Sequence, residues 1–87
     1  MKLIIAIVRD QIKDELSDAL TSAGFGETAI ASTGGFLKRG MTTLLIGVED
    51  NKLEDALGVI RSNCPATQEG MHSAIIFVLK VQDFVHL

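Results

Sequence analysis

The segment best suited to chemistry is a glycine-rich run at residues 33–40, Thr-Gly-Gly-Phe-Leu-Lys-Arg-Gly. Its two adjacent glycines allow backbone conformations closed to other residues and let a ligand approach the main-chain N–H groups. Lys38 and Arg39 add positive charge beside those donors, and Phe36 offers a flat face on which a base can stack. These groups are typical of a nucleotide-binding loop. The same run also fits a plain hairpin loop with solvated charges, because short glycine loops are common.

The soft metal ligands of the sequence are Cys64, His72 and His86. They are too far apart in the chain to match a compact zinc-binding spacing. Cys64 follows a predicted helix and is most simply a small hydrophobic residue. We therefore expect no metal site.

The acidic residues do not form a catalytic pattern. Those on the predicted helices are expected on solvated outer faces: Asp14, Glu15, Asp18, Glu54 and Asp55. No Ser, His and Asp arrangement offers an activated nucleophile. The sequence therefore predicts a protein that is not an enzyme and has no cofactor.

The elements that would position these groups follow the order β-α-β-β-α-β. The strands are predicted from apolar runs and alternation at Leu3–Val8, Thr28–Ser32, Thr42–Val48 and Ala74–Leu79. This order is that of the split βαβ, ferredoxin-like α+β fold, an antiparallel sheet with both helices on one face. Residues 1–87 are expected to form one such domain.

Two helices are predicted between the strands, with Asp10 and Asp50 as their N-caps. The first has an apolar stripe and is stopped by Gly24 in a left-handed conformation. Its stripe consists of Ile12, Leu16, Ala19, Leu20 and Ala23. The second has an inner stripe of Leu53, Ala56, Leu57 and Ile60.

The composition points to an oligomer. Hydrophobic residues make up 47% of only 87 residues, and a domain of this size has a thin margin of stability. The predicted fold leaves one face of the sheet without a helix. Either the core is unusually dense, or apolar surface is buried against partner subunits. We favour the second, because burial of that face between subunits would account for the aliphatic excess.

Charge and length exclude several classes of function. The net charge of −3 provides no field that attracts a phosphate backbone, so general nucleic-acid binding is not expected. The apolar run Leu3–Val8 is too short to span a membrane or to form a signal-peptide core. A single cysteine suits a reducing compartment, so we expect a cytoplasmic protein.

Several stretches of the sequence together resemble the PII-like cyclic di-AMP receptors. The start of the chain, MKLIIAIVRD, is followed by Thr28, the run STGGFLK at 32–38, Gly40 and Thr42-Thr43. The last predicted strand, with Asp83-Phe84 after it, resembles the C-terminal part of that family. The similarity covers nearly the whole chain, and the S-T-G-G-F-L stretch is its most specific part.

The resemblance implies a homotrimer with three nucleotide sites in the clefts between subunits and mobile loops that relay the state of the ligand. In that family the base is enclosed beside the threonine matching Thr28 and the backbone of the loop. The positions implied to contact the ligand are Thr28, Gly35, Phe36, Leu37, Met41, Gly47 and His86.

Three positions depart from the family pattern. Gly24 and Gly26 stand where the family has Asn and Arg, and Met41 stands where it has Asn. Each lost polar contact is worth about 0.5–3 kcal/mol, so cyclic di-AMP is expected to bind more weakly here. Three functions stay open: a nucleotide sensor, a PII-like module that binds an unknown protein partner without nucleotide, and a metal-responsive trimer using His72 and His86.

Overall fold

The computed structural model describes residues 1–31, 40–64, 74–83, 85 and 87, with the backbone alone at 27–31. Four strands form one sheet: β1 (Lys2–Arg9), β2 (Glu27–Ala31), β3 (Met41–Val48) and β4 (Ala74–Lys80). Two helices, α1 (Asp10–Ser22) and α2 (Leu53–Ser62), connect them, and a 3₁₀ turn, η1 (Asp50–Lys52), precedes α2. The order of elements confirms the predicted β-α-β-β-α-β arrangement.

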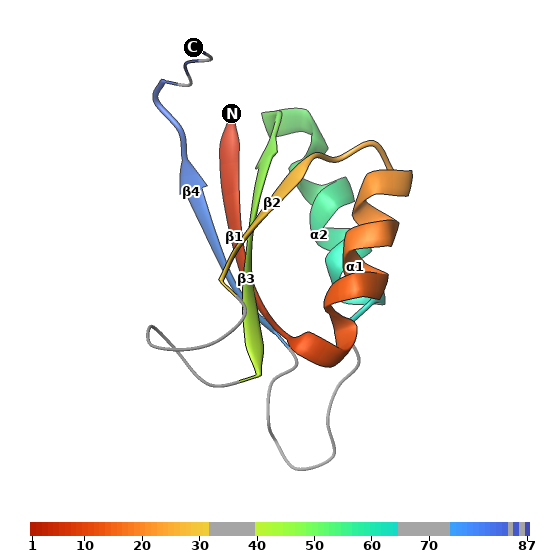
Figure 1. The fold of residues 1–87 in the computed structure, drawn as a ribbon. Coiled ribbons are helices and arrows are strands. Elements are labelled where there is room, and N and C mark those ends of the chain that lie inside the picture. The colour runs from red at the N-terminus through yellow and green to blue at the C-terminus, as the bar shows by residue number, and fades with distance from the viewer. Residues whose placement is uncertain (32–39, 65–73, 84, 86) are drawn as a thin grey trace.

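The sheet has the strand order β2-β3-β1-β4, and all neighbouring strands are antiparallel. Both helices lie on the same face of the sheet, as Figure 1 shows. This is the predicted ferredoxin-like fold. β1 is central, and its pairing runs from Lys2 opposite Val48 and Lys80 to Val8 opposite Thr42 and Ala74.

The core lies between the sheet and the helices. Alternate residues of β1 and β3 point toward the helices, because successive side chains of a strand point to opposite faces. The fully or nearly fully buried residues of this layer are Ile4, Ala6, Val8, Leu16, Leu20, Leu44, Ile46, Val48, Ala56 and Ile60. The predicted helix stripes therefore face the core, except that Ala23 lies beyond the end of α1 and is exposed.

Neither predicted N-cap is correct. The residue at the N-cap position of α1 is Arg9, and no side chain caps the helix by a hydrogen bond. Asp50 opens the 3₁₀ turn and not α2, whose N-cap position is Lys52, again without a side-chain hydrogen bond. Both aspartates have other partners: Asp10 accepts a hydrogen bond from Thr42, and Asp50 pairs with the Met1 ammonium at 2.9 Å.

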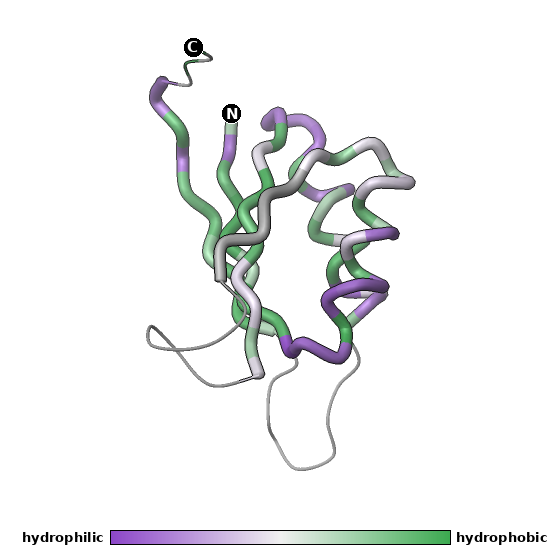
Figure 2. The backbone as a smooth tube through the Cα atoms, viewed as in Figure 1, coloured by the Kyte–Doolittle hydropathy of each residue, from purple (hydrophilic) through white to green (hydrophobic). Residues whose placement is uncertain are grey.

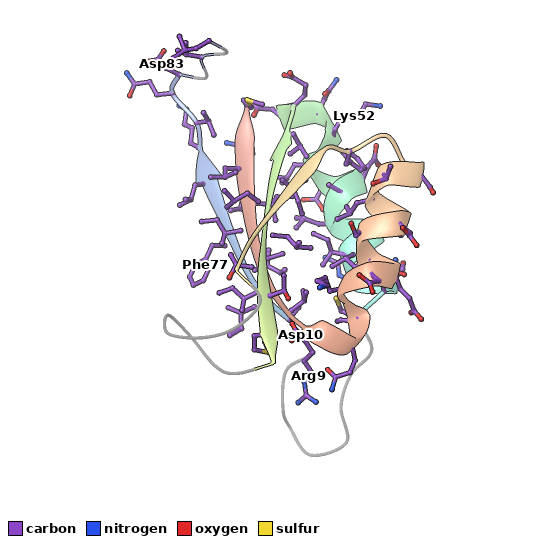
Figure 3. The ribbon with its side chains drawn as sticks, viewed as in Figure 1. Arg9, Asp10, Lys52, Phe77 and Asp83 are labelled. Carbon is purple, nitrogen blue, oxygen red and sulfur yellow. The ribbon has the colours of Figure 1, made fainter. Side chains whose placement is uncertain are left out.

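The second face of the sheet is apolar and carries no helix. We call it the outer face and define it by Leu3, Ile5, Ile7, Leu45, Ile75, Phe77 and Leu79, which alternate with the core residues of β1, β3 and β4. Figure 2 shows that β4 is largely hydrophobic, and Figure 3 shows Phe77 pointing away from the helices. Three of these side chains are strongly exposed: Ile75, Phe77 and Leu79.

Candidate functional site

The turn after α1 is built by local sequence. Gly24 has a φ of +89°, the left-handed conformation predicted for it. The N–H of Phe25 donates to the carbonyl of Leu20 at 2.9 Å, and the N–H of Gly24 donates to the carbonyl of Thr21 at 3.0 Å. This pair of bonds is a Schellman motif, and it brings Phe25 back against the core beside Leu20.

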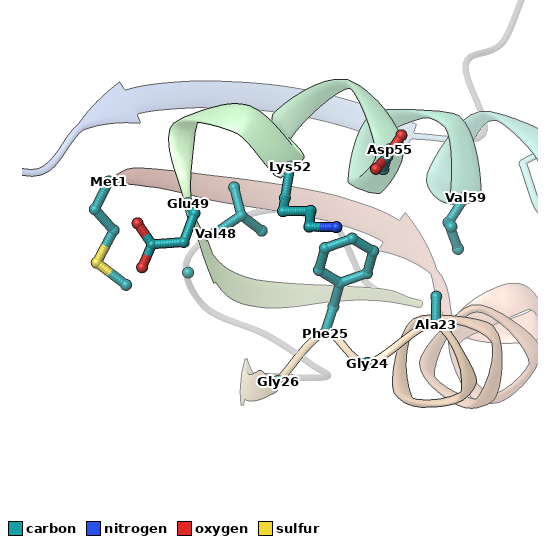
Figure 4. Close-up of a pocket in the computed structure, with 11 residues that line it drawn as sticks. Met1, Ala23, Gly24, Phe25, Gly26, Val48, Glu49, Lys52, Asp55 and Val59 are labelled. Carbon is teal, nitrogen blue, oxygen red and sulfur yellow. The ribbon is translucent and has the colours of Figure 1, made fainter.

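This turn forms one wall of a pocket at the end of the sheet. The pocket has a volume of about 440 Å³, within the range of small-molecule sites. The end of β3, the η1 turn and the first part of α2 complete it, as Figure 4 shows. The residues that line it are Met1, Ala23, Gly24, Phe25, Gly26, Gly47, Val48, Glu49, Lys52, Asp55 and Val59.

Glycines keep this pocket open. A Cβ atom added at Gly24 or Gly26 would meet no atom within 4 Å, so both positions border free space. A Cβ atom at Gly47 would come within 3.1 Å of the Met1 side chain. The pocket walls at Gly24 and Gly26 therefore offer a ligand the main chain and no side-chain donors.

Two of the predicted ligand positions, Met41 and Gly47, lie at opposite ends of β3. Gly47 lines the pocket, and Thr28 is the backbone partner of Leu45, two residues away along β3. Met41 lies at the opposite end of β3, where it pairs with Arg9. At about 3.3 Å per residue, Met41 and Gly47 are roughly 20 Å apart. Gly35, Phe36, Leu37 and His86 lie outside the described residues.

The end of β3 near Met41 is fastened to α1 by Asp10. The carboxylate of Asp10 accepts a hydrogen bond from the hydroxyl of Thr42, which is fully buried. The N–H of Asp10 donates to the carbonyl of Gly40 at 2.8 Å, and Gly40 has a φ of +77°. These two bonds fix the chain where it enters β3. Figure 3 labels Asp10 where β1 leads into α1.

We expect Thr42→Val to lower the free energy of unfolding by about 1–2 kcal/mol. Valine has nearly the same shape, so the loss is that of a hydrogen bond to a carboxylate, worth about 1.5–3 kcal/mol, partly offset by the added apolar burial. Urea unfolding at one fixed protomer concentration measures the change. Thr43→Val is the matched control, because Thr43 is on the outer face of the same strand. Equal stability of Thr42→Val and the parent chain would contradict this role.

The ionisable groups with shifted pKa values do not form a reactive centre. The hydrogen bond from the Met1 ammonium lowers the pKa of the Asp50 carboxyl. Burial raises the pKa of the Cys64 thiol, so Cys64 is protonated at neutral pH and is a poor nucleophile. Its partial packing against the core agrees with the small hydrophobic role predicted for it.

The described part of the chain contains neither a cluster of metal ligands nor a membrane-spanning helix. Within it, no three His, Cys, Asp or Glu residues lie close enough to hold a metal ion. His72 and His86 fall outside it, so the metal-responsive alternative stays a prediction. Among the described residues, no helix is long and apolar enough to cross a membrane.

Of the residues that line the pocket, sequence reasoning singled out only Gly24, Gly26 and Gly47, and those it missed include Phe25, Glu49 and Lys52. Phe25 follows the helix-ending Gly24, and a hydrophobic residue at that position is a known companion of the Schellman motif. The other two lie more than twenty residues further along the chain. The pairing of β2 with β3, in which Glu27 lies opposite Ile46, brings the turn after α1 beside the end of β3 and so beside Glu49 and Lys52.

The fold is shared with a solved structure. A crystal structure of a functionally unknown protein from Pediococcus pentosaceus ATCC 25745 matches with a TM-score of 0.81 and 32% sequence identity. The match covers 99% of this chain and 96% of that one. The family model for cyclic-di-AMP receptors matches residues 1–74. The chain therefore belongs to the PII-like cyclic-di-AMP receptor family, which indicates a nucleotide-binding signalling protein.

Proposed function

We propose that the protein is a non-enzymatic, cytoplasmic signalling subunit that binds a small nucleotide in clefts between the chains of a homotrimer. Cyclic di-AMP is the first candidate ligand. The occupied state would be passed through the loops to a protein partner. The observation that carries this proposal is the pocket bordered by Gly24, Phe25, Gly26 and Gly47 in a chain of the cyclic-di-AMP receptor family.

The positions of Met41 and Gly47 support a site between subunits. They lie at opposite ends of β3, roughly 20 Å apart at about 3.3 Å per residue. A single base bound to one chain cannot touch both. If both positions belong to one site, Met41 must come from one chain and Gly47 from its neighbour.

The outer face supports the trimer. Phe77, Ile5 and Leu45 lie side by side across β4, β1 and β3 in the strand register, and similar rows lie on either side of them. Contiguous apolar surface of this kind on a small domain marks an interaction site. In a closed trimer each chain meets its two neighbours through two different parts of its surface, so one side of the outer face would pack against the other side of the same face on a neighbouring copy.

A second candidate is a PII-like module that binds a protein partner without nucleotide. It is favoured by Gly24, Gly26 and Met41, which supply none of the Asn, Arg and Asn side chains of the family pattern. The two candidates differ in whether the pocket is occupied by a nucleotide. They share the fold and the trimer.

Calorimetric titration of the pure protein with a panel of nucleotides that includes cyclic di-AMP separates the candidates. Under the first candidate, we expect at least one nucleotide to bind, with a stoichiometry of one ligand per chain. Binding should raise the melting temperature, since a ligand that binds only the folded state stabilises it. A panel in which no nucleotide gives heat or a shift in melting temperature would favour the protein-binding module.

A further inference from the structure

The rim of the pocket carries three charged side chains: Glu49, Lys52 and Asp55. Lys52 is the one cationic side chain among the lining residues, and the ammonium of Met1, which also lines the pocket, is paired with Asp50. In the described part of the chain, Lys52 forms no ion pair, although two carboxylates border the same pocket. All three side chains are exposed, so solvent screens them and each can turn toward a ligand.

Lys52 can reach the open part of the pocket beside Gly24 and Gly26. Figure 4 shows its side chain extending across the pocket toward Phe25, which rises from the turn between Gly24 and Gly26. An ammonium group has three donors at the end of a flexible stem, so it can follow an anion over several ångströms. No other side chain that lines the pocket brings positive charge to this wall.

We propose that Lys52 determines the charge class of ligand accepted here, by binding the phosphate of a nucleotide whose uncharged part lies against Phe25. This inference rests on the proposed nucleotide-binding function and adds the residue that selects for a charged ligand. Glu49 and Asp55 oppose it, because like charges repel a phosphate within the same pocket. Lys52 therefore acts as a specificity-determining residue.

The test compares two ligands that differ by one phosphate. AMP, adenosine and cyclic di-AMP are titrated by calorimetry into the parent protein and into Lys52→Gln at low ionic strength. We expect Lys52→Gln to weaken AMP and cyclic di-AMP by about three- to tenfold, as a partly exposed charge-assisted bond would. Adenosine should bind equally to both proteins. A merely structural role of Lys52 would weaken all three ligands together.

Three control variants sharpen the comparison. Lys52→Arg keeps the charge and should retain the affinity for AMP. Lys13→Gln removes the same charge from α1, where the residue does not line the pocket, and should leave all affinities unchanged. Glu49→Gln removes a repelling carboxylate and should strengthen AMP binding. The preference for AMP should also fall as salt is raised.

The outcomes distinguish this inference from the proposed function. If the parent protein binds none of the nucleotides, the proposed function fails and the inference fails with it. If the parent protein binds AMP or cyclic di-AMP and Lys52→Gln binds them equally well, the inference alone is overturned. Loss of all three ligands in Lys52→Gln also overturns it.

Discussion

The substitution Phe77→Asp is expected to convert the proposed trimer into monomers at micromolar concentration. Phe77 is 52% exposed in the single chain, so aspartate there leaves the fold of the isolated chain intact. In a trimer that buries the outer face, each of three carboxylates would lose water without gaining a partner. The penalty for each buried ion is several kcal/mol, which exceeds what a small interface can supply.

Light scattering measures this effect directly. The parent chain should have three times the chain mass of 9.3 kDa, and Phe77→Asp should have that mass once. Val78→Asp is the matched control, because Val78 is on the same strand, is 41% exposed and points to the opposite face. A parent chain that is monomeric at micromolar concentration would end the trimer proposal. If the Phe77→Asp variant is still a trimer, the interface between subunits does not lie on the outer face.

The second large effect is expected at Gly26. Gly26→Arg should tighten the binding of cyclic di-AMP at least tenfold, which corresponds to about 1.4 kcal/mol. It restores the cation of the family pattern, and a charge-assisted bond to phosphate is about twice as strong as a neutral one. The structure has room for the change, since an added Cβ atom meets nothing within 4 Å and the φ of Gly26 is not positive.

The matched control is Gly26→Gln, which fills similar space without charge and should gain much less. Gly24→Asn is a less clean restoration, because Gly24 has a φ of +89° and any side chain there carries backbone strain, although Asn tolerates that region better than most. Calorimetry with cyclic di-AMP gives the affinities. Nanomolar binding by the parent chain, or no gain in Gly26→Arg, would show that this position does not set specificity.

Most of the fold follows from local patterns in the sequence. The apolar run in β1 predicts a central strand, and the structure extends it by one residue at each end, to Lys2–Arg9. The stripe containing Leu16 and Leu20 predicts the buried side of α1. Gly24 predicts the end of the helix region because only a residue tolerant of positive φ suits that turn. Each of these features depends on neighbours within a few positions.

The features that could not be predicted depend on pairs far apart in the chain. Asp10 has the residue type and position of an N-cap, yet its carboxylate accepts a hydrogen bond from Thr42. The hydroxyl of Thr42 is buried and needs a partner, and β3 places it next to Asp10. In the same way, Lys52 faces the turn at Gly24 and Gly26 only once β2 and β3 have paired. The sequence shows that Asp10 and Lys52 are polar, but it does not show which distant residues lie beside them in the fold.

The central place of β1 has a consequence for how the chain folds. β1 pairs with β4, the last strand, along nearly its whole length. Contacts between such distant segments form slowly, because the loop that joins them must close first. On the ribosome, one edge of β1 stays unpaired until residues 74–80 have emerged, and an unpaired edge invites aggregation. A chain that ends before residue 74 therefore has β1 as an exposed edge strand, and it also lacks the Phe77 side of its outer face.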